Sequence, residues 1–524
     1  MDIDELKETH DLYKKYIENW LFYSKSYEGG KELVRTSLTR NTRESYANWQ
    51  ERINEGINFN YSASIVDLFN FYLTERPPTR DLNVLEKNEL WAMFIRDCDL
   101  LGTNFGIFLN ESQKLSSVYG SLGVLINKPG VDKIRNVEDE LKYRAYPYCC
   151  QYTLPNILNW KFEKDPISHR INLSYLKLLE EKNKYLIWYR DHWEQWIVND
   201  SLTDSIVLKN EGKNPLNEIP FVWLTNIRGI NNKYYYLGES DIKEISLITA
   251  SIIRNISSGE EVIKYAGFPM FRKPMEEEDA QSPDNDTVAV NAVQEFNPEH
   301  GTAGKPDWME SKIEEPIMSI LSWVDRKIDE AFRIAHLSGV HGQRKNNNEV
   351  ASGLALRYEF QQLNAVLLQK SNNLSEAEEN IIKYWLKWQN MDDVYEKITI
   401  SRSKNFSIDD LSVNLKNSFS ALENIASQTF HKVLQSQVVH QMVPELKDDE
   451  FKKIEKELDE NITGNPLEKE VSTQDPDAGV PGFRPEKFDE DPSLIAPAER
   501  GRPRSDRVNK KYSRDLGRGN NNSL

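Results

Sequence analysis

The chain of 524 residues has few cysteines and no long apolar run. Its three cysteines are one isolated residue, Cys98, and the adjacent pair Cys149 and Cys150. This pattern is neither a disulfide framework nor a zinc site, so a reducing compartment is expected. No stretch of about 18 apolar residues occurs, which excludes a transmembrane helix. The charged N-terminus lacks an apolar segment, so no secretory signal is expected there.

The motifs of common enzyme classes are also missing. Gly29-Gly-Lys31 has neither the spacing nor the hydroxyl residue of a phosphate-binding loop. Gly120-Ser-Leu-Gly123 lacks the glycine two residues before the serine that a nucleophile elbow needs. No HExxH or GxGxxG motif is present, and the eight histidines are scattered. We therefore expect no enzymatic activity, no catalytic residues, no metal and no cofactor.

The formal net charge is −17. A protein that holds nucleic acid tightly usually presents a basic face, so the overall sign is wrong for a gripping function. The same sign suits a wall past which DNA slides without sticking. From charge alone, an ordinary acidic cytosolic protein is the simpler interpretation.

The first 240 residues predict an α+β unit. Apolar spacing predicts a helix over 4–26 and further helical segments over 40–110. Strands are expected at 124–126, after the turn Gly120-Ser-Leu-Gly123, and at 145–153, 169–175, 184–199 and 203–208, with a hairpin turn near Arg190-Asp-His192.

Long helices dominate the middle of the chain. A helix is predicted from Ser240, with capping-box spacing between Asp241 and Glu244. A strand-and-loop insertion follows at 267–310, and then a helix over 313–337, about 37 Å long, with Gly339 as its stop. One face of this helix is expected to carry an apolar stripe of Ile313, Ile317, Ile320, Val324, Ile328 and Phe332. After a polar loop, the helix 352–389 spans roughly 55 Å, which favours an elongated architecture or self-assembly.

The C-terminal part predicts a strand at 394–400 and helices at 408–437 and 444–462. Beyond 463 the chain is rich in Pro, Gly, Asp and Asn, which is typical of a flexible tail. The end of this tail is basic and carries Arg500, Arg502, Arg504, Arg507, Lys510, Lys511, Arg514 and Arg518.

The order of these parts resembles the bacteriophage portal protein family, over about residues 40–460. Local strings resemble it too: Tyr119-Gly-Ser-Leu-Gly-Val-Leu-Ile126 ending in Pro129, Pro220-Phe-Val222 after Asn214-Pro-Leu-Asn-Glu-Ile219, Ser352-Gly-Leu-Ala355 followed by Leu367, Lys370 and Ala377, and Phe419 to Val439 with Ser427-Gln-Thr429. Asn217 stands where many portals have glycine. Each string is weakly specific, and the ordered set is more specific than any one of them.

The resemblance implies a division of the chain into portal parts. These are an α+β wing 1–239, a first stem helix 240–266, a β-rich clip 267–311, a second stem helix 312–338, a tunnel loop 339–351, a long wing helix 352–390, a wing return 391–440, a helical crown 441–463 and a flexible tail 464–524.

The resemblance also implies a function. It indicates a ring, usually of about twelve copies, at one vertex of the virion, which assembles in the host cytoplasm and lets double-stranded DNA enter and leave. Implied partners are the terminase large subunit, a head-tail adaptor, and the major capsid and scaffolding proteins, with no membrane.

Candidate site residues follow from these parts. The tunnel loop would contact DNA phosphates through His341, Arg344 and Lys345, without reading bases. The clip would bind the terminase and later the adaptor through Arg272, Lys273, Glu276, Glu277, Glu278 and Asp279. The basic tail would bind DNA or a protein partner.

Two other interpretations stay open. One is a different phage structural or scaffold protein, although such proteins seldom place a strand-rich insertion between two stem-like helices. The other is a nucleic-acid-processing enzyme such as a nuclease or terminase, which would need a phosphate loop and acidic metal ligands that we do not find.

Overall fold

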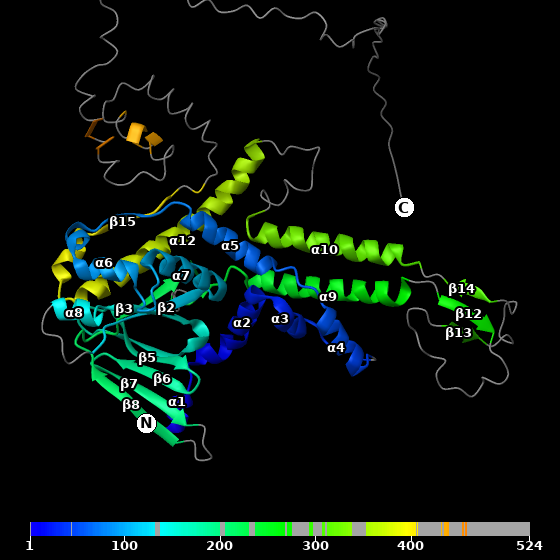
Figure 1. Ribbon diagram of the computed structural model, residues 1–524, viewed down its shortest axis with the longest axis horizontal. Coiled ribbons are helices and arrows are strands. Elements are labelled where there is room, and N and C mark those ends of the chain that lie inside the picture. Colours follow the sequence, from blue (N-terminus) through cyan, green and yellow to red (C-terminus); the bar gives the residue numbers. More distant parts are fainter. Residues whose placement is uncertain are drawn as a thin grey trace, which may run out of the picture. The chain divides into compact units, whose positions relative to one another are not determined.

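The computed structural model describes residues 2–42, 44–130, 137–199, 205–229, 236–267, 270–274, 293–296, 306–309, 312–337, 353–404 and 406, and a few helical residues between 431 and 457. The chain divides into two units, Met1–Ile408 and Asp409–Leu524. The first unit is an α+β structure, as the sequence predicts (Figure 1). Apart from those few residues, the predicted helices 408–437 and 444–462 and the tail lie outside the described residues.

The N-terminal region is helical, with one correction. The predicted single helix 4–26 is wrong, because it is two helices, α1 (Ile3–Lys7) and α2 (Asp11–Glu28). The break occurs at His10, whose Nδ1 accepts the Leu12 amide at 3.1 Å and caps α2, while its ring stacks on Trp160 at 4.2 Å. The following helices are α3 (Gly30–Ser37), α4 (Tyr46–Glu55), α5 (Tyr61–Thr74), α6 (Glu89–Arg96) and α7 (Phe105–Tyr119). Helices therefore occupy most of 40–110, as predicted.

Helix α7 packs on a three-stranded antiparallel sheet with the strand order β3-β2-β9. Its strands are β2 (Ser121–Asn127), β3 (Tyr148–Thr153) and β9 (Phe221–Thr225), and the short helix α8 (Val137–Tyr143) precedes β3. Gly120, at φ +92°, ends α7 and starts β2, and a side chain there would collide with the carbonyl of Gly238. The predicted strand at 124–126 is confirmed, but it begins earlier, at Ser121, where a turn was expected.

A five-stranded antiparallel meander follows, with strands β4 (Ile157–Lys164), β5 (Ile171–Glu181), β6 (Lys184–Tyr189), β7 (His192–Asn199) and β8 (Ser205–Lys213). The predicted hairpin turning at Arg190-Asp-His192 is confirmed as β6–β7. Strand β4 is missing from the sequence-based prediction, although Trp160 and Phe162 alternate there with Lys161 and Glu163. Helix α2 packs on one sheet face through Trp20, and α1 packs on the other through Leu6.

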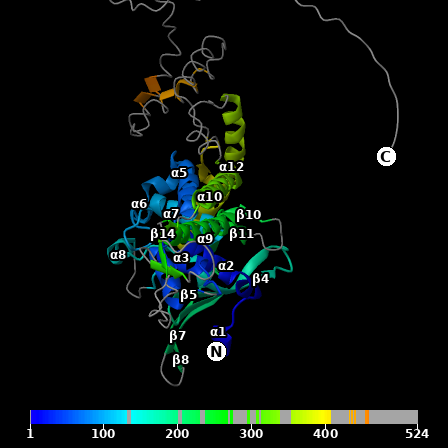
Figure 2. The same cartoon turned by 90° about the vertical axis from the view of Figure 1, so that its right-hand side faces the viewer.

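In the sequence, a small sheet lies between two long helices, α9 (Lys243–Ala266) and α10 (Glu314–Ile334). Its strands are β12 (Met270–Pro274), β13 (Val293–Phe296) and β14 (Asp307–Met309), in the order β13-β12-β14. The two helices run side by side, and the chain passes from the end of α9 through the sheet to the start of α10 (Figures 1 and 2). The predicted strand-rich insertion between helices is therefore present in the described segments.

The ends of these helices differ from the sequence-based prediction. The capping box at Asp241 and Glu244 is wrong, because α9 starts at Lys243 without a side-chain cap. Helix α10 ends at Ile334, not next to Gly339: His336 adopts φ +57° and the Leu337 amide donates to the Phe332 carbonyl at 2.8 Å. This is a Schellman-type end with histidine in the left-handed position.

The longest helix, α12 (Gly353–Trp388), confirms the prediction for 352–389. The predicted strand 394–400 is mostly wrong, because a 3-10 turn (Asp392–Lys397) folds Val394 and Tyr395 onto the core. Only β15 (Thr399–Ser401) is extended, and it pairs with β1 (Thr79–Asp81).

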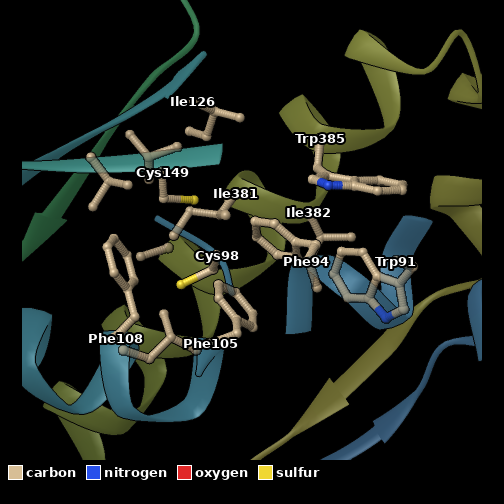
Figure 3. Packing of buried hydrophobic residues seen from close by; sticks show 14 of the residues in the cluster. Trp91, Phe94, Cys98, Phe105, Phe108, Ile126, Cys149, Ile381, Ile382 and Trp385 are labelled. Atoms are coloured by element: carbon tan, nitrogen blue, oxygen red, sulfur yellow. The ribbon is translucent and has the colours of Figure 1, made fainter. Parts of the chain in front are cut away.

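The C-terminal half of α12 crosses an aromatic core (Figure 3). Trp385 is fully buried, with its ring centroid 5.0 Å from that of Trp91 in an edge-to-face arrangement. Phe94 and Phe105 complete the group, and Cys98 and Cys149 are buried beside it. Burial raises the pKa of both thiols, so they act as small apolar side chains rather than as reactive groups.

A buried ion pair joins α12 to the start of α9. The ammonium of Lys370 is 0% exposed and bonds to the Asp241 carboxylate, which is 3% exposed. Lys370 also donates to Asn226 Oδ1 at 2.7 Å, and Asn226 Nδ2 donates to Asp241 Oδ1 at 2.8 Å. Burial lowers the pKa of Lys370, and the adjacent Asp241 opposes this shift.

We expect Lys370→Met to lower the free energy of unfolding by about 3–5 kcal/mol, because it leaves the Asp241 carboxylate buried without its cation. The double variant Lys370→Met/Asp241→Leu should regain most of this loss. Denaturant unfolding measures both effects, with the exposed Lys209→Met as the control. A Lys370→Met protein as stable as the control would contradict the assignment.

Candidate functional site: the paired helices α9 and α10

The predicted site residues fall largely outside what the structure describes. This holds for the tunnel-loop residues His341, Arg344 and Lys345, for the acidic run Glu276–Asp279, and for the basic tail. Arg272 and Lys273 lie on β12, in the small sheet. The roles of all these residues stay predictions. What the structure describes in detail is the helix pair that precedes and follows the insertion.

Helix α10 packs on α9 through one narrow stripe. Val324 and Ala331 are buried, and Ile320 lies over Gly259 of α9, where an added methyl group would meet it at 3.6 Å. Lys327 Nζ donates to Ser251 Oγ of α9 at 2.7 Å. Ile320 and Val324 of the predicted apolar stripe therefore lie on the face that holds the two helices together, whereas Phe332 of that stripe contacts Tyr61 of α5.

The side of α10 opposite this stripe is polar throughout. At about 100° per residue, the positions farthest from Val324 form one outer line along the helix. They are Glu315, Ser319, Ser322, Arg326, Asp329 and Arg333. Arg333 is engaged by Glu330, with Nε 2.8 Å from Oε2, and this hydrogen bond lowers the pKa of Glu330. This outer line can face water or a passing polyanion, but it does not present a row of free cations.

The two flanks between the stripe and the outer line each carry exposed apolar side chains. Met318 and Leu321 lie on one flank and are 61% and 53% exposed. Trp323 lies on the other flank and is 51% exposed, with the Lys327 ammonium 5.3 Å from its ring centroid. Both flanks of this helix therefore expose large apolar side chains, whereas its outer line is polar.

A closed ion-pair cluster fixes α4 against α9. The Arg52 guanidinium bonds to both carboxylate oxygens of Glu44, at 2.6 and 2.8 Å, and Arg52 NH1 donates to Ser257 Oγ of α9 at 3.3 Å. The hydrogen bond from Arg52 lowers the pKa of Glu44, whereas burial raises that of nearby Glu261. Arg52 therefore links α4 to the Glu44 carboxylate and to α9.

The described residues contain no group of three or more His, Cys, Asp or Glu side chains that could hold a metal ion. Among the helices that the structure describes, none has the length and apolar composition of a membrane span.

No family model and no curated protein matches the chain. Among solved structures, a chain of the virion of a native gene transfer agent (GTA) particle is 11% identical, covering 77% of this chain and 98% of that chain, with a TM-score of 0.40. A chain of the neck of an empty GTA particle computed with C6 symmetry is 10% identical, covering 78% and 99%, with a TM-score of 0.39. A chain of the native neck computed with C12 symmetry is 10% identical, covering 71% and 89%, with a TM-score of 0.36. Similarity at this level assigns no function.

The flanks of α10 should be dispensable for folding of the single chain. We expect Leu321→Ala to change the free energy of unfolding of the monomer by no more than about 0.5 kcal/mol, because this side chain is half exposed. Val324→Ala, three residues on and buried, should cost about 2 kcal/mol. Denaturant unfolding at a concentration where the chain is monomeric compares the two. Equal losses would show that Leu321 belongs to the core of the single chain.

Proposed function

We propose that this chain is the subunit of a portal-type ring at one vertex of a phage-like head, through which double-stranded DNA enters and leaves. The observation that carries the proposal is the three-sided pattern of α10. One side is buried on α9, the outer line is polar, and both flanks expose apolar side chains. A helix that lines a channel inside a ring needs this pattern, with a wet side toward the channel and a neighbour on each side.

Different patches on opposite flanks favour a ring over a twofold dimer. A twofold interface uses the same patch on both copies, whereas a head-to-tail interface joins two different patches and closes when the rotation permits. Met318 and Leu321 form an aliphatic patch, and Trp323 forms an aromatic one. The resemblance in the sequence suggests about twelve copies.

The charge of such a ring suits sliding better than gripping. At −17 per chain, about twelve copies would carry roughly 200 negative charges. DNA bound by many free lysines would be held tightly, with an affinity that depends steeply on salt. The engagement of Arg333 by Glu330 keeps one outward cation of α10 from acting as a strong phosphate ligand.

The remaining parts take the roles that the portal resemblance implies. His341, Arg344 and Lys345 make transient phosphate contacts in the tunnel loop. Arg272, Lys273 and the acidic run Glu276–Asp279 form the docking surface for the terminase and then the adaptor. The terminase supplies the energy for packaging, because the sequence of this chain contains no phosphate-binding loop.

The mass of the purified protein tests the proposal. We predict a main species of about twelve chains, each of 61.0 kDa, in mass photometry at micromolar concentration. Substituting serine at Met318, Leu321 and Trp323 together should give folded monomers, because these positions supply the lateral contacts. A native chain that stays monomeric across a range of salt concentrations would contradict the ring.

The basic tail allows a separate test of DNA contact. Removing the chain after Pro497 should leave the ring intact, since the segment has no apolar periodicity. It should also lower the affinity of the ring for non-specific duplex DNA at low salt and flatten the salt dependence. A full-length control with the eight basic residues of 500–518 changed to Gln should behave like the truncation. Equal DNA binding by all three proteins would refute the DNA role.

A further inference from the structure

The two flanks of α10 differ in charge as well as in apolar chemistry. The flank with Met318 and Leu321 also carries Glu314 and Asp325, and we call it the acidic flank. The flank with Trp323 carries Lys327 and Glu330 and is bordered by Arg326. The Glu330 carboxylate is paired with Arg333, so Lys327 and Arg326 leave this flank positive, and we call it the basic flank.

The basic flank has an unbalanced positive charge. Lys327 has a hydroxyl group, that of Ser251, and the Trp323 ring as its partners, and the structure shows no ion pair to a carboxylate for it among the described residues. Its pKa is lowered by burial and by the neighbouring Arg254. A cation in this setting is stabilised by an approaching carboxylate, so the flank suits an acidic partner.

Part of the acidic flank is already covered within the chain. Phe332, farther along α10, contacts the ring of Tyr61 on α5, with centroids 6.2 Å apart. Burial raises the pKa of Tyr61, and the nearby Asp325 carboxylate adds to this rise. The free part of the flank is therefore its N-terminal half, which holds Met318 and Leu321, with the exposed Asp325 at its border.

Resting on the proposed ring, we infer that the basic flank of one copy packs on the acidic flank of the next, with Trp323 against Leu321 and Lys327 facing Asp325. The spacing supports this pairing. When the ring axis is parallel to α10, the same residue lies at the same height along the axis in every copy. Trp323 and Leu321 differ in height by about 3 Å, as do Lys327 and Asp325, at 1.5 Å per residue. Side chains of these lengths span that offset.

The same charges disfavour the alternative pairing of like flanks. A twofold contact through the acidic flanks would bring Glu314 and Asp325 close to their own copies, and one through the basic flanks would bring Lys327 close to Lys327. Like charges placed together across an interface weaken it. The pairing therefore selects head-to-tail contacts, which close into rings, over twofold dimers.

Crosslinking between introduced cysteines tests the pairing. The native Cys98 and Cys149 are buried and Cys150 is partly buried, so the unmodified chain is treated in parallel to measure the background that Cys150 gives. With a short bismaleimide, Leu321→Cys/Trp323→Cys should give a ladder of covalent oligomers, whereas each single variant should stay monomeric on denaturing gels. Dimers from a single variant would show a twofold contact, and assembled double-variant rings without a ladder would show other partners. Both results would overturn the pairing but leave the ring, whose mass is measured separately.

A charge exchange covers the case in which the cysteine variant does not assemble. Lys327→Glu and Asp325→Lys should each raise the concentration needed for ring assembly about tenfold. The double variant Lys327→Glu/Asp325→Lys should recover to within about threefold of the native chain. Circular dichroism confirms that each variant is folded. A double variant that assembles no better than the worse single variant would overturn the pairing.

Discussion

The buried pair of Lys370 and Asp241 is the constraint on which the arrangement of the first unit depends. Both charges are removed from water, and the cost is offset only because Asn226 and Ser117 satisfy the remaining hydrogen bonds. The two partners lie 129 residues apart in sequence. One comes from α12 and the other from the turn before α9, so the pair fixes where α9 leaves the sheet-containing body.

The direction of α9 then determines what α10 can do. Helix α9 is held by the Lys370 pair at its start and by the Arg52 cluster farther along. Helix α10 packs on α9 through Ile320, Val324 and Ala331, with a hydrogen bond from Lys327 to Ser251. The apolar side chains on its flanks are therefore surplus to the fold of one chain. In the proposed ring, contacts between copies would bury them.

The sequence predicted those elements whose pattern is local. Apolar spacing located α9, α10 and α12 within a few residues, and alternation with a turn located the β6–β7 hairpin. The sequence-based prediction failed where a residue far away in the sequence determines the local structure. Asp241 has the spacing of a capping box, but its carboxylate forms an ion pair with Lys370 instead. The helix expected over 4–26 is interrupted at His10, because the His10 ring stacks on Trp160, which lies on a strand 150 residues later.

At the candidate site, too, the sequence predicted the local pattern but not the contacts between helices. The sequence indicated a helix with an apolar stripe over 313–337, but it could not show which apolar residues the partner helix covers. Only the packing on α9 separates Val324 from Leu321 and Trp323, and so reveals the two flanks. The tunnel-loop, clip and tail residues were inferred from their place in the chain and from the portal resemblance, and their roles stay predictions.

Electron microscopy of the purified full-length chain tests the ring most directly. We predict end-on class averages with rotational symmetry and a central channel, with the density of the α10 helix adjacent to the channel. Side views should show the small sheet at one end of the helix pair. Averages of single, unassociated particles, or of twofold dimers without a channel, would contradict the central claim that this chain forms a conduit with its own copies.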